Sequence, residues 1–365
     1  MLKKKVLIIF AGGFVGLLAV ILVQQGNPSN MGICIACFLR DISGALGLHR
    51  AAPVQYMRPE ILGLVLGAFG SSLVTREFRA IGGSNALTRF MLAIISMVGM
   101  LVFLGCPLRL LLRLAGGDFN ALLGLAGLVT GTAAGAWFLN RGFTLGRAMP
   151  QKKINGYLFP VIIFILLLLL FFTPSLLFSS QAGPGSLHAP LLISLGAGLF
   201  IGILAQRSHL CMAGGIRDLI LSRDIHLLSG FISLLVIALI GNMLTGSFNP
   251  GFTNQPLAHS DGVWNFLGMM LGGWGFVLLG GCPLRQLVAA SDGNTDCAVT
   301  VLGLLLGAAL AHNFGLAASP KGVPLAGKVS VIIGLVIIFA IAFFNSKFLT
   351  TKLSAQGVSS NVQGN

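Results

Sequence analysis

The sequence has few charged residues: Asp, Glu, Lys and Arg make up 9% of its 365 residues, whereas 55% are apolar. Soluble domains carry roughly a quarter charged residues, so this composition excludes an ordinary soluble globular protein. Acidic residues are the scarcest, with nine Asp and Glu against 23 Lys and Arg. Because long apolar runs separate the cations, the positive excess indicates a lipid partner and not a nucleic acid.

Three motifs that the sequence lacks narrow the range of possible functions. The sequence contains no Gly-x-x-x-x-Gly-Lys-Ser/Thr motif, so a nucleotide-driven pump is not indicated. The nine acids and six histidines form no evident cluster with metal-ligand spacing, which disfavours a metal transporter, and we expect neither a metal nor a cofactor. The first apolar segment lacks a small-residue cleavage site, so we expect it to be retained and not removed as a signal peptide.

Ten apolar segments are long enough to cross a bilayer, which takes about 20 residues. They cover residues 6–23, 60–75, 90–105, 119–139, 157–178, 189–205, 227–246, 262–281, 297–314 and 329–344. Four shorter apolar pieces, each headed by a cysteine, cover residues 31–48, 106–115, 210–225 and 282–290. We therefore expect an all-α polytopic membrane protein with about ten transmembrane helices and four short re-entrant helices.

The two halves of the chain repeat one another. Cys34, Arg40, Asp41 and His49 match Cys211, Arg217, Asp218 and His226, and Gly105-Cys106-Pro107-Leu108-Arg109 matches Gly281-Cys282-Pro283-Leu284-Arg285. If the short helices return to the side from which they enter, five crossings precede the second repeat, so the repeats are inverted. We expect a first repeat over 1–150, a linker helix over 151–188, a second repeat over 189–320, and a final helix with a cytoplasmic tail over 321–365.

The distribution of Lys and Arg predicts the orientation. With the amino terminus in the cytoplasm, the segments on the inner side hold most of these cations, whereas the loops at 179–188 and 247–261 hold none. By the positive-inside rule, both termini are cytoplasmic, in a multi-pass protein of the plasma (inner) membrane.

Both Gly-Cys-Pro-Leu-Arg motifs are typical of broken helices in transporters. Gly ends the preceding span, Cys stands at the N-cap, and Pro takes the first helical position, where its missing N–H costs nothing. The free N–H groups and the helix dipole attract anions, and Arg109 and Arg285 add positive charge one turn inside. An alternative is that each Gly-Cys-Pro only ends one helix and starts the next.

The segments that begin at Cys34 and Cys211 supply the other candidate residues. Four thiols, from Cys34, Cys106, Cys211 and Cys282, line one path from both sides in this interpretation, and soft, weakly hydrogen-bonding thiols suit a sulfur- or selenium-bearing ion. Further candidates for substrate binding are Cys37, Arg40 and Arg217. The Arg-Asp pairs at 40–41 and 217–218 are equally consistent with structural ion pairs, and Cys297 and the Gly127/Gly131 and Gly303/Gly307 pairs with packing.

These motifs resemble the YeeE/YedE sulfur-transport family over nearly the whole chain. The stretch from Gly26 to Phe38 is most similar to the YedE branch of selenium transporters. The resemblance implies thiosulfate uptake along conserved cysteines in an inverted, hourglass-shaped protein, and these cysteines correspond to Cys34, Cys106 and Cys282. Cys37 and the Arg after each Gly-Cys-Pro-Leu depart from the thiosulfate transporters.

Two hypotheses from different classes remain. The first is a non-enzymatic transporter or channel that brings a small inorganic sulfur or selenium ion inward, with a cytoplasmic sulfur or selenium carrier protein as a partner. The second is a membrane thiol-disulfide oxidoreductase built on Cys34-x-x-Cys37, a spacing that redox dithiols use. Against the second, Gly214 stands where the matching cysteine would be.

Overall fold

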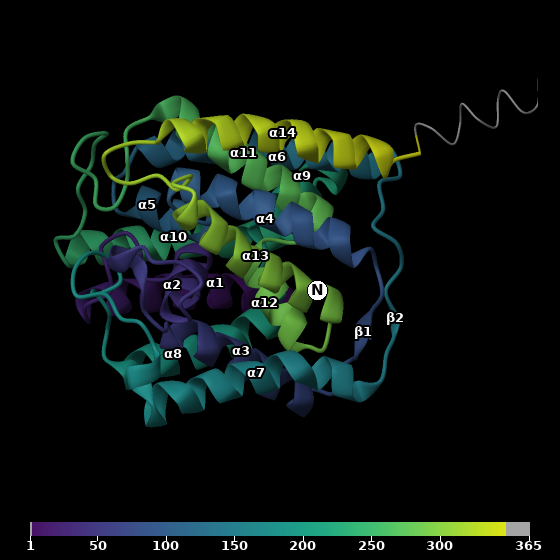
Figure 1. The fold of residues 1–365 in the computed structure, drawn as a ribbon, viewed down its shortest axis with the longest axis horizontal. Helices are drawn as coiled ribbons and strands as arrows, with labels where there is room; N and C mark the ends of the chain where they lie inside the picture. Colours follow the sequence, from purple (N-terminus) through teal and green to yellow (C-terminus); the bar gives the residue numbers. More distant parts are fainter. Residues whose placement is uncertain (1, 348–365) are drawn as a thin grey trace, which may run out of the picture.

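The computed structural model describes residues 2–347, which form a bundle of α-helices (Figure 1). The helices are α1 (Leu2–Gln24), α2 (Ile35–Ala45), α3 (Pro59–Val74), α4 (Ala86–Phe103), α5 (Pro107–Ala115), α6 (Asn120–Asn140), α7 (Lys153–Phe172), α8 (Leu191–Ser208), α9 (Met212–Ser222), α10 (His226–Leu244), α11 (Gly262–Leu279), α12 (Pro283–Ser291), α13 (Thr295–Asn313) and α14 (Leu325–Phe344). Two 3-10 turns, Ala52–Val54 and Pro174–Leu176, and two short strands, β1 (Ile81–Gly82) and β2 (Met149–Pro150), complete the described chain.

The described residues hold ten segments long and apolar enough to span a membrane, each built on one long helix and three of them continuing into α5, α9 or α12, which confirms the predicted all-α polytopic fold. The long helices are α1, α3, α4, α6, α7, α8, α10, α11, α13 and α14. The other four, α2, α5, α9 and α12, have only nine or eleven residues. At 1.5 Å per residue they reach about 14–16 Å, roughly half of the hydrocarbon thickness.

Helices of one repeat pack mainly against helices of the other. α6 lies along α11, as α13 lies along α4, and α3 lies along α8, as α10 lies along α1. The matched glycine pairs permit this close approach: a Cβ at Gly127 would lie 2.0 Å from the carbonyl oxygen of Phe266, and one at Gly303 would lie 2.8 Å from that of Phe90. The predicted packing role of these glycines is therefore confirmed.

Matched turns of the two repeats lie at opposite ends of the bundle. Asn294, in the turn between α12 and α13, pairs with Ile81 of β1, and β1 pairs with β2. Asp118, in the equivalent turn between α5 and α6, pairs with Gly251 in the loop before α11. Figure 1 shows β1 at one end of the bundle and α5 toward the other, as an inverted repeat requires. We call the end with β1 the inner end, following the predicted orientation, and the end with Gly251 the outer end.

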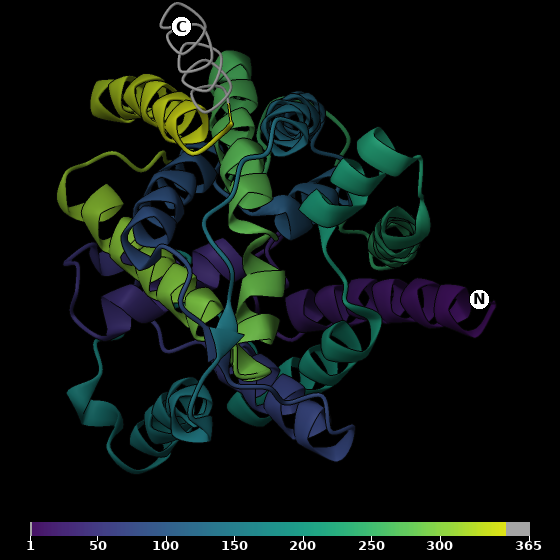
Figure 2. The same ribbon diagram turned by 90° about the vertical axis from the view of Figure 1, so that its right-hand side faces the viewer.

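Helices α7 and α14 each follow the six helices of one repeat and lie at opposite edges of the bundle (Figures 1 and 2). α7 is continuous through Pro160, and Pro174 begins the 3-10 turn that follows it. The predicted cytoplasmic tail, with Lys352, lies largely outside the described residues.

Candidate functional site

Each of the four short helices begins directly after a cysteine, as the motifs predict. Cys34, Cys106, Cys211 and Cys282 are the N-cap residues of α2, α5, α9 and α12, and all four have an extended backbone and are buried. Pro107 and Pro283 take the first helical positions, where proline is favoured because its ring presets the helical φ. Four helix N-termini therefore carry a thiol in the interior of the bundle.

The cysteines form two pairs. In the first pair, Cys34 Sγ lies 3.8 Å from Cys106 Sγ and accepts a hydrogen bond of 3.3 Å from the backbone N–H of Cys37. In the second pair, Cys211 Sγ accepts hydrogen bonds from the backbone N–H groups of Gly214 and Cys282, at 3.3 and 3.4 Å. A disulfide would bring two sulfur atoms to about 2.05 Å, so Cys34 and Cys106 are separate thiols.

The two pairs belong to helices that pack against one another across the repeats. α2 of the first repeat contacts α12 of the second, and α5 contacts α9. The helices that carry the first pair approach from the outer end and those that carry the second pair approach from the inner end. These contacts place helices of both pairs side by side inside the bundle.

The two arginines of the repeated motif have different surroundings. Arg109 is buried, and it donates to the carbonyl oxygens of Leu104, Asn30 (3.0 Å) and Leu257 (3.1 Å). Arg285 is only partly buried and donates to His209 Nδ1 at 3.2 Å. The guanidinium group of Arg109 is therefore held by backbone carbonyls inside the bundle, whereas that of Arg285 is partly open to solvent.

The side chain of Cys37 interacts with both Arg109 and Cys34. Its Sγ accepts a hydrogen bond from Arg109 Nη1 at 3.3 Å, while the Sγ of Cys34 contacts Cys106. Each thiol of this dithiol spacing therefore has a further partner, a cation for Cys37 and a cysteine of a different helix for Cys34. Both are free thiols, and this arrangement does not favour the oxidoreductase hypothesis. The contact between Cys37 and Arg109 has no counterpart in the second repeat, where Gly214 replaces the cysteine, and sequence reasoning did not find it.

Both Arg-Asp sequences form ion pairs, at very different depths. Asp41 accepts from Arg40 and from Arg58, each at 2.7 Å, and the side chains of Asp41 and Arg58 are fully buried. Arg217 and Asp218 also meet at 2.7 Å, but nearly a third of each side chain is exposed. Arg58 was not among the predicted site residues because nothing in its sequence neighbourhood matches the other repeat.

A cavity of about 280 Å³ lies at the outer end, beside the first cysteine pair. Its lining includes Arg40, Arg109, Met31 and Leu104, close in sequence to Cys34 and Cys106, and His312 from the end of α13. Two buried guanidinium groups beside a cavity form a site with positive potential for an anion. The ring of His312 lies 4.8 Å from that of His49 between centroids, with the two planes tilted by 31°. No sequence signal marks it, because only the fold brings the end of α13 to this cavity.

The inner end carries a mixed cluster of charges. Asp292 caps the C-terminus of α12, and burial raises the pKa of this carboxyl to about 7, with Arg285 opposing the shift and Glu77 adding to it. Glu77 accepts a hydrogen bond from Gln206 and pairs with Arg207 at 3.5 Å. The inner end thus presents acids and cations together, in contrast to the cationic outer cavity.

The remaining histidine and cysteine candidates occupy structural positions. His49 is buried, its Nε2 lies 3.0 Å from the carbonyl oxygen of Arg40, and burial lowers its pKa. His226 is the first residue of α10, so only this member of the pair lies at an exposed helix end. The backbone N–H of Cys297 donates to Asn294 in the first turn of α13, and its side chain is buried. Within residues 2–347, no group of three or more His, Cys, Asp or Glu side chains is arranged to hold a metal ion.

Comparison with known proteins gives one likeness, in the second half of the chain. Residues 207–356, which include Cys211 and Cys282, match a family model described as sulphur transport. No curated protein is similar enough to the chain to register as a match. The match covers 150 of the 365 residues and is a likeness of this part of the chain to that family. The ten apolar segments indicate a multi-pass membrane protein.

Proposed function

We propose that this protein carries a small inorganic anion containing sulfur or selenium inward across the plasma membrane, and that the anion passes along the two cysteine pairs. The observation that carries the proposal is the placement of Cys34, Cys106, Cys211 and Cys282 at the buried N-termini of four half-length helices. Helices of this kind, in matched repeats, are the places where transporters bind substrates near the bilayer midplane.

The charges beside the path support an anionic substrate. An anion that enters the outer cavity meets Arg40 and Arg109 and lies beside Met31. Beyond it, helix N-termini favour negative charge, and at the inner end the partly exposed Arg285 provides a further cation. Arg217, in its partly exposed pair with Asp218, adds a cation to the same repeat.

The thiols favour a soft substrate over a strongly hydrated one. A thiol is a weak hydrogen-bond donor and a polarisable contact, so it binds a terminal sulfur or selenium atom without holding it tightly. We propose that the ion is passed from the first pair to the second by exchange of such contacts, with no covalent bond formed. The resemblance of the Gly26–Phe38 stretch to selenium transporters makes a selenium species a substrate to be tested beside thiosulfate.

Inward movement requires that something removes the ion inside. We propose a cytoplasmic sulfur or selenium carrier protein that receives the ion at the inner end, and cytoplasmic termini as the positive-inside rule predicts. In this proposal the protein is a transporter and not an enzyme.

The test is uptake of radiolabelled thiosulfate and selenite by cells that express the intact protein. We expect Cys106→Ala and Cys282→Ala to abolish uptake, because each removes one thiol of a pair. Cys297→Ala is the matched control, a buried cysteine outside both pairs. Uptake that persists in both pair variants would exclude the cysteine path.

Cys37→Ala separates the two hypotheses. Under the transport proposal it retains uptake, because Cys34 keeps its contact with Cys106. Loss of a redox activity in Cys37→Ala, in a protein that shows no uptake at all, would instead favour the oxidoreductase.

A further inference from the structure

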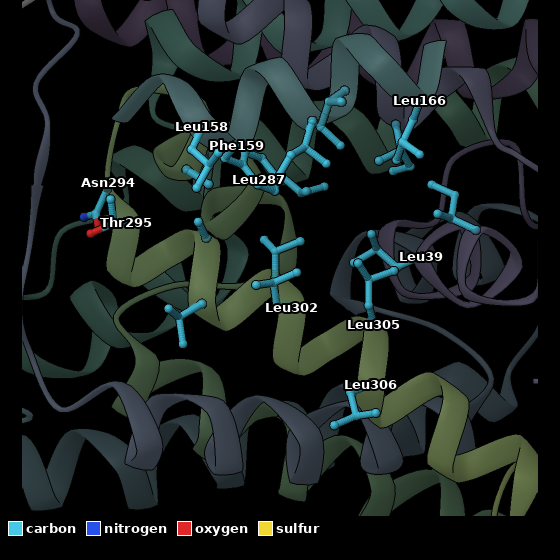
Figure 3. Close-up of a pocket in the computed structure, with 18 of the residues that line it drawn as sticks. Leu39, Leu158, Phe159, Leu166, Leu287, Asn294, Thr295, Leu302, Leu305 and Leu306 are labelled. Atoms are coloured by element: carbon cyan, nitrogen blue, oxygen red, sulfur yellow. The ribbon is translucent and has the colours of Figure 1, made fainter. Parts of the chain in front are cut away.

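A long apolar groove runs between α7 and α13, away from the cysteine pairs. Its volume is about 440 Å³. Leu158, Phe159 and Leu166 of α7 face Leu302 and Leu305 of α13 across it (Figure 3). Apart from three residues at one end, its lining is apolar, so a polar or charged substrate gains nothing by entering it.

The groove is open toward the membrane. Ile162 of α7 is 44% exposed and Leu302 of α13 is 53% exposed, although both line the groove. The groove extends along α13 from Thr295, at its polar end, to Leu306, which corresponds to about 16 Å of helix. One leaflet of the hydrocarbon core has a thickness of about 15 Å, so the length of the groove matches one acyl chain.

The polar end of the groove is cationic. Asn155, Asn294 and Thr295 line this end, and Figure 3 shows the nitrogen and oxygen atoms of Asn294 and Thr295 apart from the leucines. The exposed residues Lys152 and Lys153 stand at the N-terminus of α7, within one turn of Asn155. Exposed lysines at the inner end of a membrane helix attract anionic lipid headgroups.

We propose that this groove binds one anionic glycerophospholipid of the inner leaflet, with an acyl chain between α7 and α13 and the phosphate beside Lys152 and Lys153. The bound acyl chain contacts both repeats, because Leu39 of α2 and Leu287 of α12 lie on the wall of the groove. These two residues belong to the helices that begin after Cys34 and Cys282. The lipid thereby fixes the spacing of one half-length helix from each repeat.

The test is native mass spectrometry of the full-length protein after reconstitution in vesicles of phosphatidylethanolamine and phosphatidylglycerol and mild extraction. We expect one retained phosphatidylglycerol. Ile162→Trp fills the groove and should lower the retained fraction several-fold. Val161→Trp is the matched control, because Val161 is equally exposed at 48% but is not part of the lining. Leu302→Trp fills the groove from α13 and should reproduce the loss.

The headgroup is tested separately. The double variant Lys152→Gln, Lys153→Gln should lose the preference for phosphatidylglycerol over phosphatidylethanolamine, whereas Lys321→Gln, an exposed lysine at the outer end, should keep it. Equal retention in Ile162→Trp and Val161→Trp would overturn the site, and so would an isoprenoid quinone retained from cell membranes in place of a phospholipid. The measurement is independent of uptake, so its failure leaves the proposed transport function untouched.

Discussion

Asp41 and Asp218 stand at matching positions of the two repeats and each follows an arginine, yet they differ in burial. Asp41 bridges Arg40 and Arg58 with its side chain fully buried. Asp218 pairs with Arg217, with 28% of its side chain exposed. Replacing each by Asn keeps the shape of the side chain and removes only its negative charge, so the repeat supplies its own control.

The expected costs follow from burial. Asp41→Asn leaves two buried guanidinium groups without an anion, and breaking a buried ion pair from one side costs about 3–5 kcal/mol. Arg58 keeps its hydrogen bonds to the carbonyl oxygens of Pro184 and Leu187, which satisfy its N–H groups but do not neutralise its charge. Asp218→Asn removes a partly exposed pair, and such a pair is worth at most about 1 kcal/mol.

The assay is a denaturant titration of the purified variants in the same detergent, followed by the change in helical circular dichroism. We expect the midpoint for Asp41→Asn to fall clearly below that of the unmodified protein and that for Asp218→Asn to stay close to it. Equal midpoints for the two variants would refute the reasoning, which rests on the deeper burial of Asp41 and on its second arginine partner.

Three further predictions follow from the structure. Arg285→Ala should lower uptake roughly tenfold with little loss of stability, and unchanged uptake in this variant would contradict the prediction. Arg109→Ala should instead lower the denaturation midpoint, because three backbone carbonyls lose their donor. The raised pKa of Asp292, about 7 against an ordinary 3.8, means that its contribution to stability is present below about pH 4 and is lost as the pH rises through 7. Asp292→Asn should therefore flatten the dependence of the unfolding midpoint on pH, and a dependence that is unaltered between about pH 4 and pH 8 argues against the shift. Gly127→Ala should lower the yield of folded protein in size-exclusion chromatography, because its Cβ would lie 2.0 Å from a carbonyl oxygen. Gly70→Ala is the control and should leave the yield unchanged, because nothing lies within 4 Å of its Cβ. Similar yields for the two variants would contradict the close packing at Gly127.

The spans and the short helices could be predicted because each depends on local chemistry. A membrane-crossing helix needs a long run of apolar residues, and the ten predicted segments coincide with ten apolar helices. The half-length helices were marked by a cysteine and, twice, by a following proline, and Cys106 and Cys282 are indeed N-caps. The matched glycines predicted close helix packing, which the short distances at Gly127 and Gly303 confirm.

The sequence repeat did not predict the surroundings of matching residues, because these residues have different neighbours in the fold. Arg109 and Arg285 share one motif, but Arg109 is surrounded by carbonyl groups from Asn30, Leu104 and Leu257, whereas Arg285 is partly exposed beside His209. The pairing of Cys37 with Arg109 is likewise invisible in the sequence, since the two residues come together only when α2 packs beside α5.

The sequence by itself determined the membrane class, the number of spans, the duplication and the cysteines that head the short helices, because hydropathy, capping and repetition act along the chain. The tertiary structure alone decided which charges are paired, which arginine of the repeated motif is partly exposed, and where α7 leaves a groove against α13. These properties depend on contacts between segments far apart in the chain, such as Arg58 with Leu187 or His312 with His49. A duplicated sequence does not make those contacts equal, because each copy packs against a different set of loops.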